Sequence, residues 1–297
     1  MANLKEVRDR ISSVTSTQQI TKAMKMVAAA KLRRAQQAIV EMRPYSNKLS
    51  DMLSNILSNL EGDVETSFGV VRPVEKALVV VITSNRGLCG AFNSSVTKLA
   101  KRLIEEKYQD LAENGNLSLL FIGKKGLDAF RRRKDLNLIT DYTELVGKEF
   151  SFEDSAKVAS LLMEQFESGE YDSIEIVYGQ FKNAAVQNFV VEQFLPVAKI
   201  EAEGVASDVN TNFTFEPDQE TLLDYLVPTI LKTQFHKTIL DSNASEQGSR
   251  MTAMDKATDN AEDMLKGLKI NYNKARQEAI TAEISEIVGG VAALEGK

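Results

Sequence analysis

The sequence has 297 residues, of which 43% are apolar and 26% charged, with no tryptophan and a formal net charge of −6. These values are typical of a folded, soluble, helix-rich protein with one large domain or two smaller ones. The chain lacks the run of about 18 apolar residues that a membrane-spanning helix needs. A single cysteine, Cys89, excludes an internal disulfide and fits a reducing compartment.

Residues 1–60 carry an apolar heptad repeat and contain no glycine. Steps of three and four residues from Leu4 to Leu60 meet 17 positions, and 13 of these are apolar. Such a repeat predicts a coiled-coil helix. Proline inside a helix costs about 3 kcal/mol or forces a kink. Because Pro44 interrupts the repeat, we expect a helix to about Met42 and a bend or second helix from Tyr45.

The same segment is basic, with ten Lys or Arg residues against four Asp or Glu. No acidic residue lies between Asp9 and Glu41. The basic stretch is either a solvated helix face or a collar that meets acidic groups of a partner. Nucleic acid is disfavoured, because no aromatic residue that could stack on bases precedes Tyr45. Three consecutive positions of the repeat are polar and weaken it locally: Gln18, Thr21 and Lys25.

The middle of the chain has a different pattern, in which short apolar, β-branched runs alternate with helical stretches. The runs predict strands at residues 77–82, 117–122 and 171–178, with a fourth at 186–194. Helices are expected at residues 93–111, 124–133 and 152–168, and a loop or edge strand at 199–215. This alternation predicts a small α/β domain with a mainly parallel sheet.

A second apolar heptad repeat runs from Leu223 to Ala282, with 14 of 18 positions apolar. We expect its helix to begin after residues 216–218 and to end near Val288, before two glycines. Since the ends of a compact domain usually lie close together, the two repeats should fold back as an antiparallel pair. The expected segments are residues 1–60 and 216–297, the coiled-coil helices, with a Rossmann-like α/β domain at 73–205 inserted between them.

The end of the second helix is apolar outside its repeat. The residues concerned are Ile280, Ile284, Ile287, Val288, Val291 and Leu294. An apolar surface that extends beyond its helical partner must be covered. We therefore expect a sleeve supplied by other chains.

A turn with the sequence Thr-Ser-Asn-Arg-Gly-Leu-Cys-Gly, residues 83–90, follows the first strand and precedes a helix. Phosphate often binds at this place in α/β folds, but the spacing matches no phosphate-binding motif. A structural turn that also touches a partner is the favoured interpretation, with Arg86, Gly87, Cys89 and Gly90 as its candidate residues. Cys89 is expected to be a small buried residue, and the only histidine, His236, to have a packing role. No Cys/His cluster suggests a zinc site.

Three stretches of this sequence resemble the gamma subunit of F-type ATP synthase. The first is residues 11–34, centred on Ile-Thr-Lys-Ala-Met at 20–24, and the second is the turn at 83–90. The third runs from Ala-Ser-Glu-Gln at 244–247, through Tyr-Asn-Lys-Ala-Arg-Gln at 272–277, to Glu-Ile-Val-Gly-Gly at 286–290. The resemblance covers the chain from end to end.

The resemblance implies a rotor subunit without catalytic residues or cofactors. In this family the paired terminal helices stand inside a ring of three alpha and three beta subunits. The α/β domain and the epsilon subunit form the lower stalk on the membrane ring of c subunits. Proton passage turns this rotor, and the rotor drives the catalytic beta subunits through their states during ATP synthesis or hydrolysis. With no presequence at its start, the chain is expected at the cytoplasmic side of the bacterial plasma membrane, as a peripheral subunit.

The resemblance also implies contact residues. Positions matching Arg250, Gln277 and Thr281 hydrogen-bond the catch region of alpha and beta, and those matching Met24 and Lys25 face an acidic lever loop of beta. The apolar residues Ile284, Ile287 and Val288 are expected to contact the ring, and a foot near residues 200–215 to contact the c subunits. Two departures stand out. The paired-cysteine insertion of plastid members is absent, and Asn85 stands where many relatives have Asp.

Overall fold

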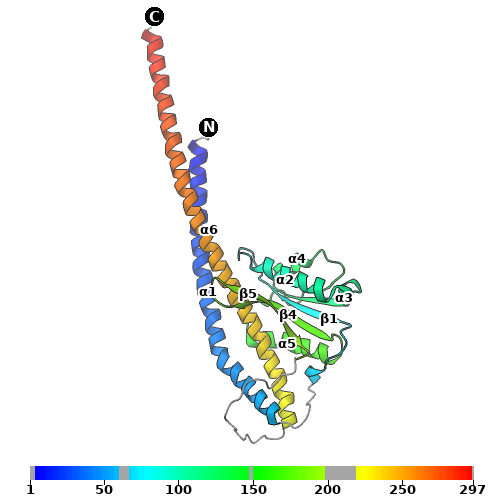
Figure 1. The fold of residues 1–297 in the computed structure, drawn as a ribbon. Coiled ribbons are helices and arrows are strands. Elements are labelled where there is room, and N and C mark those ends of the chain that lie inside the picture. The colour runs from blue at the N-terminus through cyan, green and yellow to red at the C-terminus, as the bar shows by residue number, and fades with distance from the viewer. Residues whose placement is uncertain (1–3, 60–66, 147–149, 198–218, 296–297) are drawn as a thin grey trace. The chain divides into compact units, whose positions relative to one another are not determined.

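The computed structural model describes residues 4–59, 67–146, 150–197 and 219–295. It divides into two compact units. One unit combines residues 1–28 with residues 251–297, and the other comprises residues 29–250. The first helix, α1 (Leu4–Asn59), and the last, α6 (Gln219–Glu295), each contribute to both units (Figure 1). The expected foot at residues 200–215 lies outside the described residues.

Helix α1 continues through Pro44, so the helix does not end near Met42 and no second helix begins at Tyr45. Proline removes one backbone hydrogen bond, but the neighbouring turns keep theirs. Side chains on both sides of the proline are anchored by packing, since Ile39 and Leu49 are each only 7% exposed. This tertiary packing outweighs the local cost of the proline.

Helix α6 starts where the sequence indicates but runs to Glu295, past the expected end near Val288. It also contains Pro228 and four glycines. A glycine inside a helix costs about 1 kcal/mol relative to alanine, and this weakens a helix without necessarily ending it. No proline follows Gly290 to force a stop.

In the first unit the two helices pair in opposite directions. Arg8 donates a hydrogen bond to the Tyr272 hydroxyl at 3.1 Å, and Thr258 donates to the Thr21 hydroxyl at 2.8 Å. As residue numbers rise along α1 they fall along α6, and this defines an antiparallel pair. Small side chains such as Ala28, 1% exposed, allow the helices to approach closely. The predicted antiparallel coiled coil is therefore confirmed.

The second unit contains a five-stranded sheet in the order β3-β2-β1-β4-β5. Its strands are β1 (Ala77–Ile82), β2 (Leu117–Ile122), β3 (Asn137–Ile139), β4 (Ser173–Phe181) and β5 (Gln187–Leu195). All neighbouring strands are parallel except β4 and β5. The first two expected strands have the expected bounds, and the others begin one or two residues later. The short edge strand β3 was not predicted, because its three residues form no apolar run.

The helices of this unit are α2 (Phe92–Lys107), α3 (Gln109–Glu113), α4 (Lys124–Phe130) and α5 (Phe152–Glu167), with a short 3₁₀ helix η1 (Ser67–Gly69). The single helix expected at 93–111 is divided at Tyr108. This residue is buried and lies 3.2 Å from the Ser173 hydroxyl through its own hydroxyl. Its backbone leaves helical geometry, with φ −125°. A long-range hydrogen bond thus sets a boundary that local sequence does not show.

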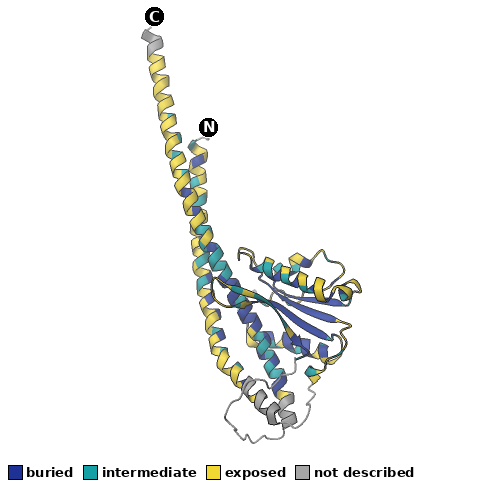
Figure 2. Ribbon diagram, in the orientation of Figure 1, coloured by how far each residue is buried: buried dark blue, intermediate teal, exposed yellow. Residues whose placement is uncertain are grey.

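Helices cover both faces of the sheet (Figure 1). On one face α2 and α4 bury Phe92 and Phe130 against β1 and β2. On the other face α5 and the first part of α6 bury Phe166 and Phe235. Figure 2 shows the buried sheet between these layers. The first part of α6 is therefore a structural part of the α/β domain. No helix among the described residues is long and apolar enough to span a membrane.

Candidate interaction sites

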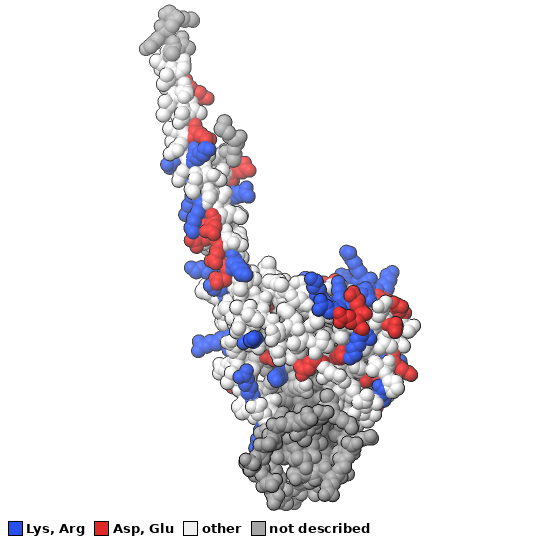
Figure 3. All heavy atoms as spheres, in the orientation of Figure 1, with Lys and Arg blue, Asp and Glu red and all other residues white. Residues whose placement is uncertain are grey.

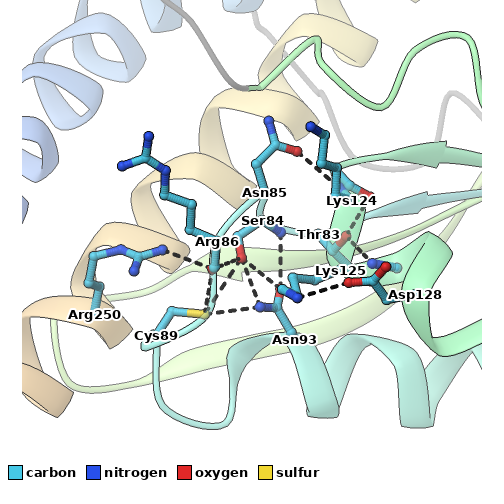
Figure 4. Close-up of polar contacts among 12 residues, drawn as sticks. Thr83, Ser84, Asn85, Arg86, Cys89, Asn93, Lys124, Lys125, Asp128 and Arg250 are labelled. Carbon is cyan, nitrogen blue, oxygen red and sulfur yellow. Dashed lines mark hydrogen bonds and ion pairs between the residues drawn. The ribbon is translucent and has the colours of Figure 1, made fainter.

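The turn at residues 83–90 is held by hydrogen bonds within its own chain (Figure 4). The Ser84 hydroxyl donates to the Arg86 carbonyl at 2.6 Å, and the Asn93 amide donates to the Cys89 sulfur at 3.1 Å. Cys89 is 1% exposed, which confirms the expected small buried residue. Leu88 has a positive φ of 64° and a side chain that is 67% exposed. The turn therefore has a fixed polar interior and displays an apolar side chain.

The start of α4 closes the other side of the turn. The Thr83 hydroxyl accepts a hydrogen bond from the Gly126 amide at 2.8 Å, and the Asn85 side-chain oxygen accepts from the Lys124 amide at 2.9 Å. An aspartate at position 85 could accept the same bond. The Asn85 amide nitrogen is buried and has no hydrogen-bond partner among the described residues. Asn85, which replaces the aspartate of many relatives, therefore keeps the hydrogen bond from the Lys124 amide.

Helix α6 binds the outer side of the turn through Arg250. Its guanidinium donates to the carbonyls of Gly87 at 2.5 Å and Arg86 at 3.2 Å, and to the Glu246 carboxylate at 2.5 Å. The Ser249 hydroxyl donates to the Cys89 carbonyl at 2.7 Å. Sequence reasoning missed this contact. The i, i+4 spacing of Glu246 and Arg250 was visible, but the turn is more than 150 residues away in the sequence.

In the coiled-coil unit, two of the polar positions of the α1 repeat, Thr21 and Lys25, have partners on α6. Lys25 forms an ion pair with Asp255, and Thr21 accepts the Thr258 hydrogen bond. The Lys25 and Asp255 side chains are 41% and 48% exposed, so this surface pair contributes at most about 1 kcal/mol. Lys25 is therefore paired within its own chain yet remains accessible to another carboxylate. Met24 is half-buried beside it.

The same unit ends in an uncovered length of α6. Every residue from 281 to 291 is exposed (Figure 2). Ile284, Ile287 and Val288 are 56%, 67% and 62% exposed. Thr281 donates only to the Gln277 carbonyl of the preceding turn, at 2.9 Å, and the Gln277 side chain is exposed. The structure thus places these predicted contact residues on one segment, whereas Arg250 and the turn belong to the other unit. The side chain of Leu294 lies outside those described.

His236 has a packing role, as expected. It makes edge-type contacts with the rings of Phe150 and Phe152, with centroid distances of 5.7 Å and 5.4 Å, and its Nδ1 is 2.9 Å from the Ser155 hydroxyl. Burial lowers the pKa of His236 and favours the neutral ring. Within the described parts of the chain, no three His, Cys, Asp or Glu side chains are grouped so that they could hold a metal ion.

These features define a class of protein, in which an α/β sheet domain is inserted between two long terminal helices that pair as an antiparallel coiled coil. A family model described as ATP synthase matches residues 3–294. The ATP synthase gamma chain of Cytophaga hutchinsonii is 48% identical over 99% of both chains, and that of Flavobacterium psychrophilum is 51% identical over the whole of both. The chain belongs to the family of ATP synthase gamma chains.

Solved structures agree in fold. The chain is similar to one in the central stalk and c-ring of Tetrahymena thermophila mitochondrial ATP synthase, with 25% identity and a TM-score of 0.55, over 80% of this chain and 99% of that one. It is also similar to a chain of the Euglena gracilis mitochondrial OSCP/F1/c-ring assembly, with 24% identity and a TM-score of 0.66, over 98% and 94%. The family and the fold class expected from the sequence are thereby confirmed.

Proposed function

We propose that this chain is the central-stalk rotor subunit of a bacterial ATP synthase. It couples proton-driven rotation of a c-ring to the conformational cycle of catalytic beta subunits, for ATP synthesis and, in reverse, hydrolysis. The chain supplies torque and timing, and catalysis belongs to beta. The observation that carries this proposal is the antiparallel helix pair with an uncovered apolar end, found in a member of the gamma chain family.

The coiled-coil unit suits a position inside a ring of three alpha and three beta subunits. Apolar side chains at Ile284, Ile287 and Val288 provide a surface that a hydrophobic sleeve would cover. Gln277 and Thr281 lie near them with polar groups directed to solvent or to their own helix. Lys25 can exchange Asp255 for a carboxylate of beta at little cost, because their pair is half exposed.

The α/β unit suits the lower stalk, where epsilon and the c-ring would bind. The Arg250 and Ser249 contacts join α6 to the turn at 83–90, so the helix and the sheet domain resist separation when one of them is turned. Arg86, Gly87 and Gly90 stay proposed partner contacts through this turn, whereas Cys89, which is 1% exposed, supports the turn from its interior. The Arg250 guanidinium already donates hydrogen bonds to acceptors of its own chain. A hydrogen bond from Arg250 to the catch region of alpha and beta would have to share the same N–H groups. We place the subunit peripherally, at the cytoplasmic side of the plasma membrane.

The alternative of a phosphate-binding scaffold finds less support. The side chains of Thr83, Ser84 and Asn85 form hydrogen bonds within the chain. Helix α4, which begins beside the turn, uses two of its first backbone amides, those of Lys124 and Gly126, in these bonds. A calorimetric titration with ATP and ADP should therefore give no binding heat for the isolated chain.

Reconstitution tests the rotor function. We expect the purified chain to hydrolyse no ATP alone and to restore hydrolysis when mixed with alpha and beta subunits. Gln277→Leu should lower the restored rate about tenfold, as loss of one polar contact of about 1.4 kcal/mol implies. Lys25→Ala should weaken coupling, and neither change should shift the melting temperature of the isolated chain by more than about 3 °C, because both side chains are substantially exposed.

The matched control is Lys182→Ala, an exposed lysine in the other unit. A deletion variant gives the decisive comparison. If a chain without residues 1–30 and 270–297 restored hydrolysis as well as the full chain, the rotor proposal would be wrong.

A further inference from the structure

One surface of the α/β unit concentrates positive charge in a chain whose net charge is −6. This surface, called the basic face, is formed by α2, α4 and the residues after α4. It consists of Lys98, Lys101, Arg102, Lys124, Lys125, Arg131, Arg132, Arg133 and Lys134. Figure 3 shows basic side chains gathered over this part of the domain, with acidic side chains among them. Residues 124–134 alone contain six cations and one acid, Asp128.

Contacts between the elements hold these cations on one surface. Lys101 of α2 lies over the ring of Phe130, at the end of α4, with its Nζ 5.8 Å from the centroid. On α4, a hydrogen bond from Lys125 lowers the pKa of Asp128, and the charges of Lys125, Arg131 and Lys124 lower it further. The two helices therefore present their basic residues together.

Four of these nine cations form ion pairs with carboxylates of the same chain. Ion pairs join Lys124 to Glu144 at 2.5 Å, Lys125 to Asp128 at 2.8 Å, Arg133 to Asp135 at 2.6 Å and Arg102 to Glu106 at 3.9 Å. The other five cations have no ion pair among the described residues. These are Lys98, Lys101, Arg131, Arg132 and Lys134.

Surface cations are ordinarily solvated by water. The negative end of the helix dipole, at the C-terminus, also stabilises positive charge. Arg131 follows the last residue of α4, so the helix dipole accounts for this residue and for Arg132 beside it. It does not account for Lys98 and Lys101, which lie in the second and third turns of α2, before its last turn. Gathering like charges on one face opposes folding through their repulsion. A complementary anionic partner would remove that repulsion.

We propose that the basic face docks an acidic protein surface, rich in Asp and Glu, within the assembly that contains this chain. Arginine binds carboxylates in a bidentate manner, which suits Arg131 and Arg132 to such a surface. Among the described residues between Cys89 and Ser151, no large apolar side chain is exposed. The face thus lacks the apolar anchors that strengthen binding to a lipid surface and the aromatic rings that stack on bases. The inference rests on the chain's proposed place in an assembly.

Carbodiimide cross-linking of the intact assembly tests this docking. The reagent joins a lysine amine to a carboxylate in direct contact, and peptide mass spectrometry then identifies both residues. We expect cross-links from Lys98, Lys101 and Lys134 to Asp or Glu of another subunit. In an R131E/R132E/K134E variant, the yield at Lys98 and Lys101 should fall at least about fivefold, as replacing attraction by repulsion at three surface sites implies. Raising the salt concentration should lower the yield in the same direction.

The control variant K76E/K157E/K182E makes the same change in net charge at three exposed lysines of the same unit, and it should leave the yield unchanged. Circular dichroism of both variants checks that they fold.

Co-purification of the unmodified chain with an ATPase ring, measured first, separates failure of the rotor function from failure of the docking proposal. The docking proposal is overturned if these lysines cross-link only within their own chain in an intact ring-bearing assembly. It is also overturned if the face instead binds phosphatidylglycerol vesicles or duplex DNA while intersubunit cross-links are absent.

Discussion

At the scale of the residue, Asp241 is a buried carboxyl whose ionisation opposes folding. It lies on α6, is 7% exposed, and burial raises its pKa to about 6, although Lys237 and Arg43 lower it and Glu192 raises it further. Because the folded state binds this proton more tightly than the unfolded state, the proton's stabilising effect is complete only below about pH 4. It is lost as the pH rises through about 6.

We therefore expect Asp241→Asn to raise the free energy of unfolding at pH 7.5 by about 1–3 kcal/mol, as a pKa shift of this size implies. The variant should also flatten the decline in stability between pH 4 and 6. Urea unfolding across this pH range measures both effects, with Asp110→Asn at an exposed site as the control. A loss of stability at pH 7.5 would show that attraction to Arg43 and Lys237 outweighs burial.

A second prediction at this scale concerns Gly123, which links β2 to α4. Its φ is 101°, and an added Cβ would lie 2.1 Å from the Thr83 carbonyl oxygen. Gly123→Ala must therefore move the turn away from α4, at a cost of about 3 kcal/mol or more in unfolding free energy. Gly87→Ala, in the neighbouring turn at residues 83–90, is the matched control, since a Cβ there meets nothing within 4 Å. Equal melting temperatures for the two variants would contradict this reading of the turn.

At the scale of the element, the sequence predicted structure best where local pattern and burial agree. Strands β1 and β2 are fully buried, and their apolar runs give their bounds correctly. Strand β3 has only three residues, none of them buried, and its pairing with β2 leaves no such pattern. At two places tertiary contacts determine a structure that the local sequence does not predict. Side-chain packing keeps α1 continuous through Pro44, and a hydrogen bond between Tyr108 and Ser173 ends α2.

The contact sites also divide into those that the local sequence predicts and those that depend on tertiary contacts. The turn at 83–90 was found because its residues are adjacent in the sequence and follow a strand. The attachment of Arg250 to Gly87 was not found, because pairing over such a separation depends on the completed fold. Asp255 was likewise unrecognised as the partner of Lys25, although both lie at positions where an antiparallel pair brings them together. Sequence patterns identify single helices and turns, and the alignment of two elements needs coordinates.

At the scale of the whole molecule, the apolar end of α6 should matter to assembly and hardly at all to the stability of the chain. Residues 281–291 are all exposed, and apolar burial contributes about 25 cal/mol per Å² only where water is removed. Replacing Ile284, Ile287 and Val288 together by Ser should therefore leave the melting temperature of the isolated chain within about 2 °C of the original value. The same variant should bind an alpha–beta ring at least about tenfold more weakly if the ring buries these side chains.

Leu265→Ser provides the opposite case on the same helix. Leu265 is 8% exposed within the antiparallel pair, so placing a hydroxyl there should lower stability by about 2–4 kcal/mol. Thermal unfolding of the isolated variants and ring binding by analytical ultracentrifugation separate the two effects. If the triple serine variant bound the ring normally, these side chains would not be contact residues. If it unfolded early in isolation, the end of α6 would be covered within the chain itself. The expected combination, an unchanged melting temperature with lost binding, assigns the hydrophobic surface to the partner subunits.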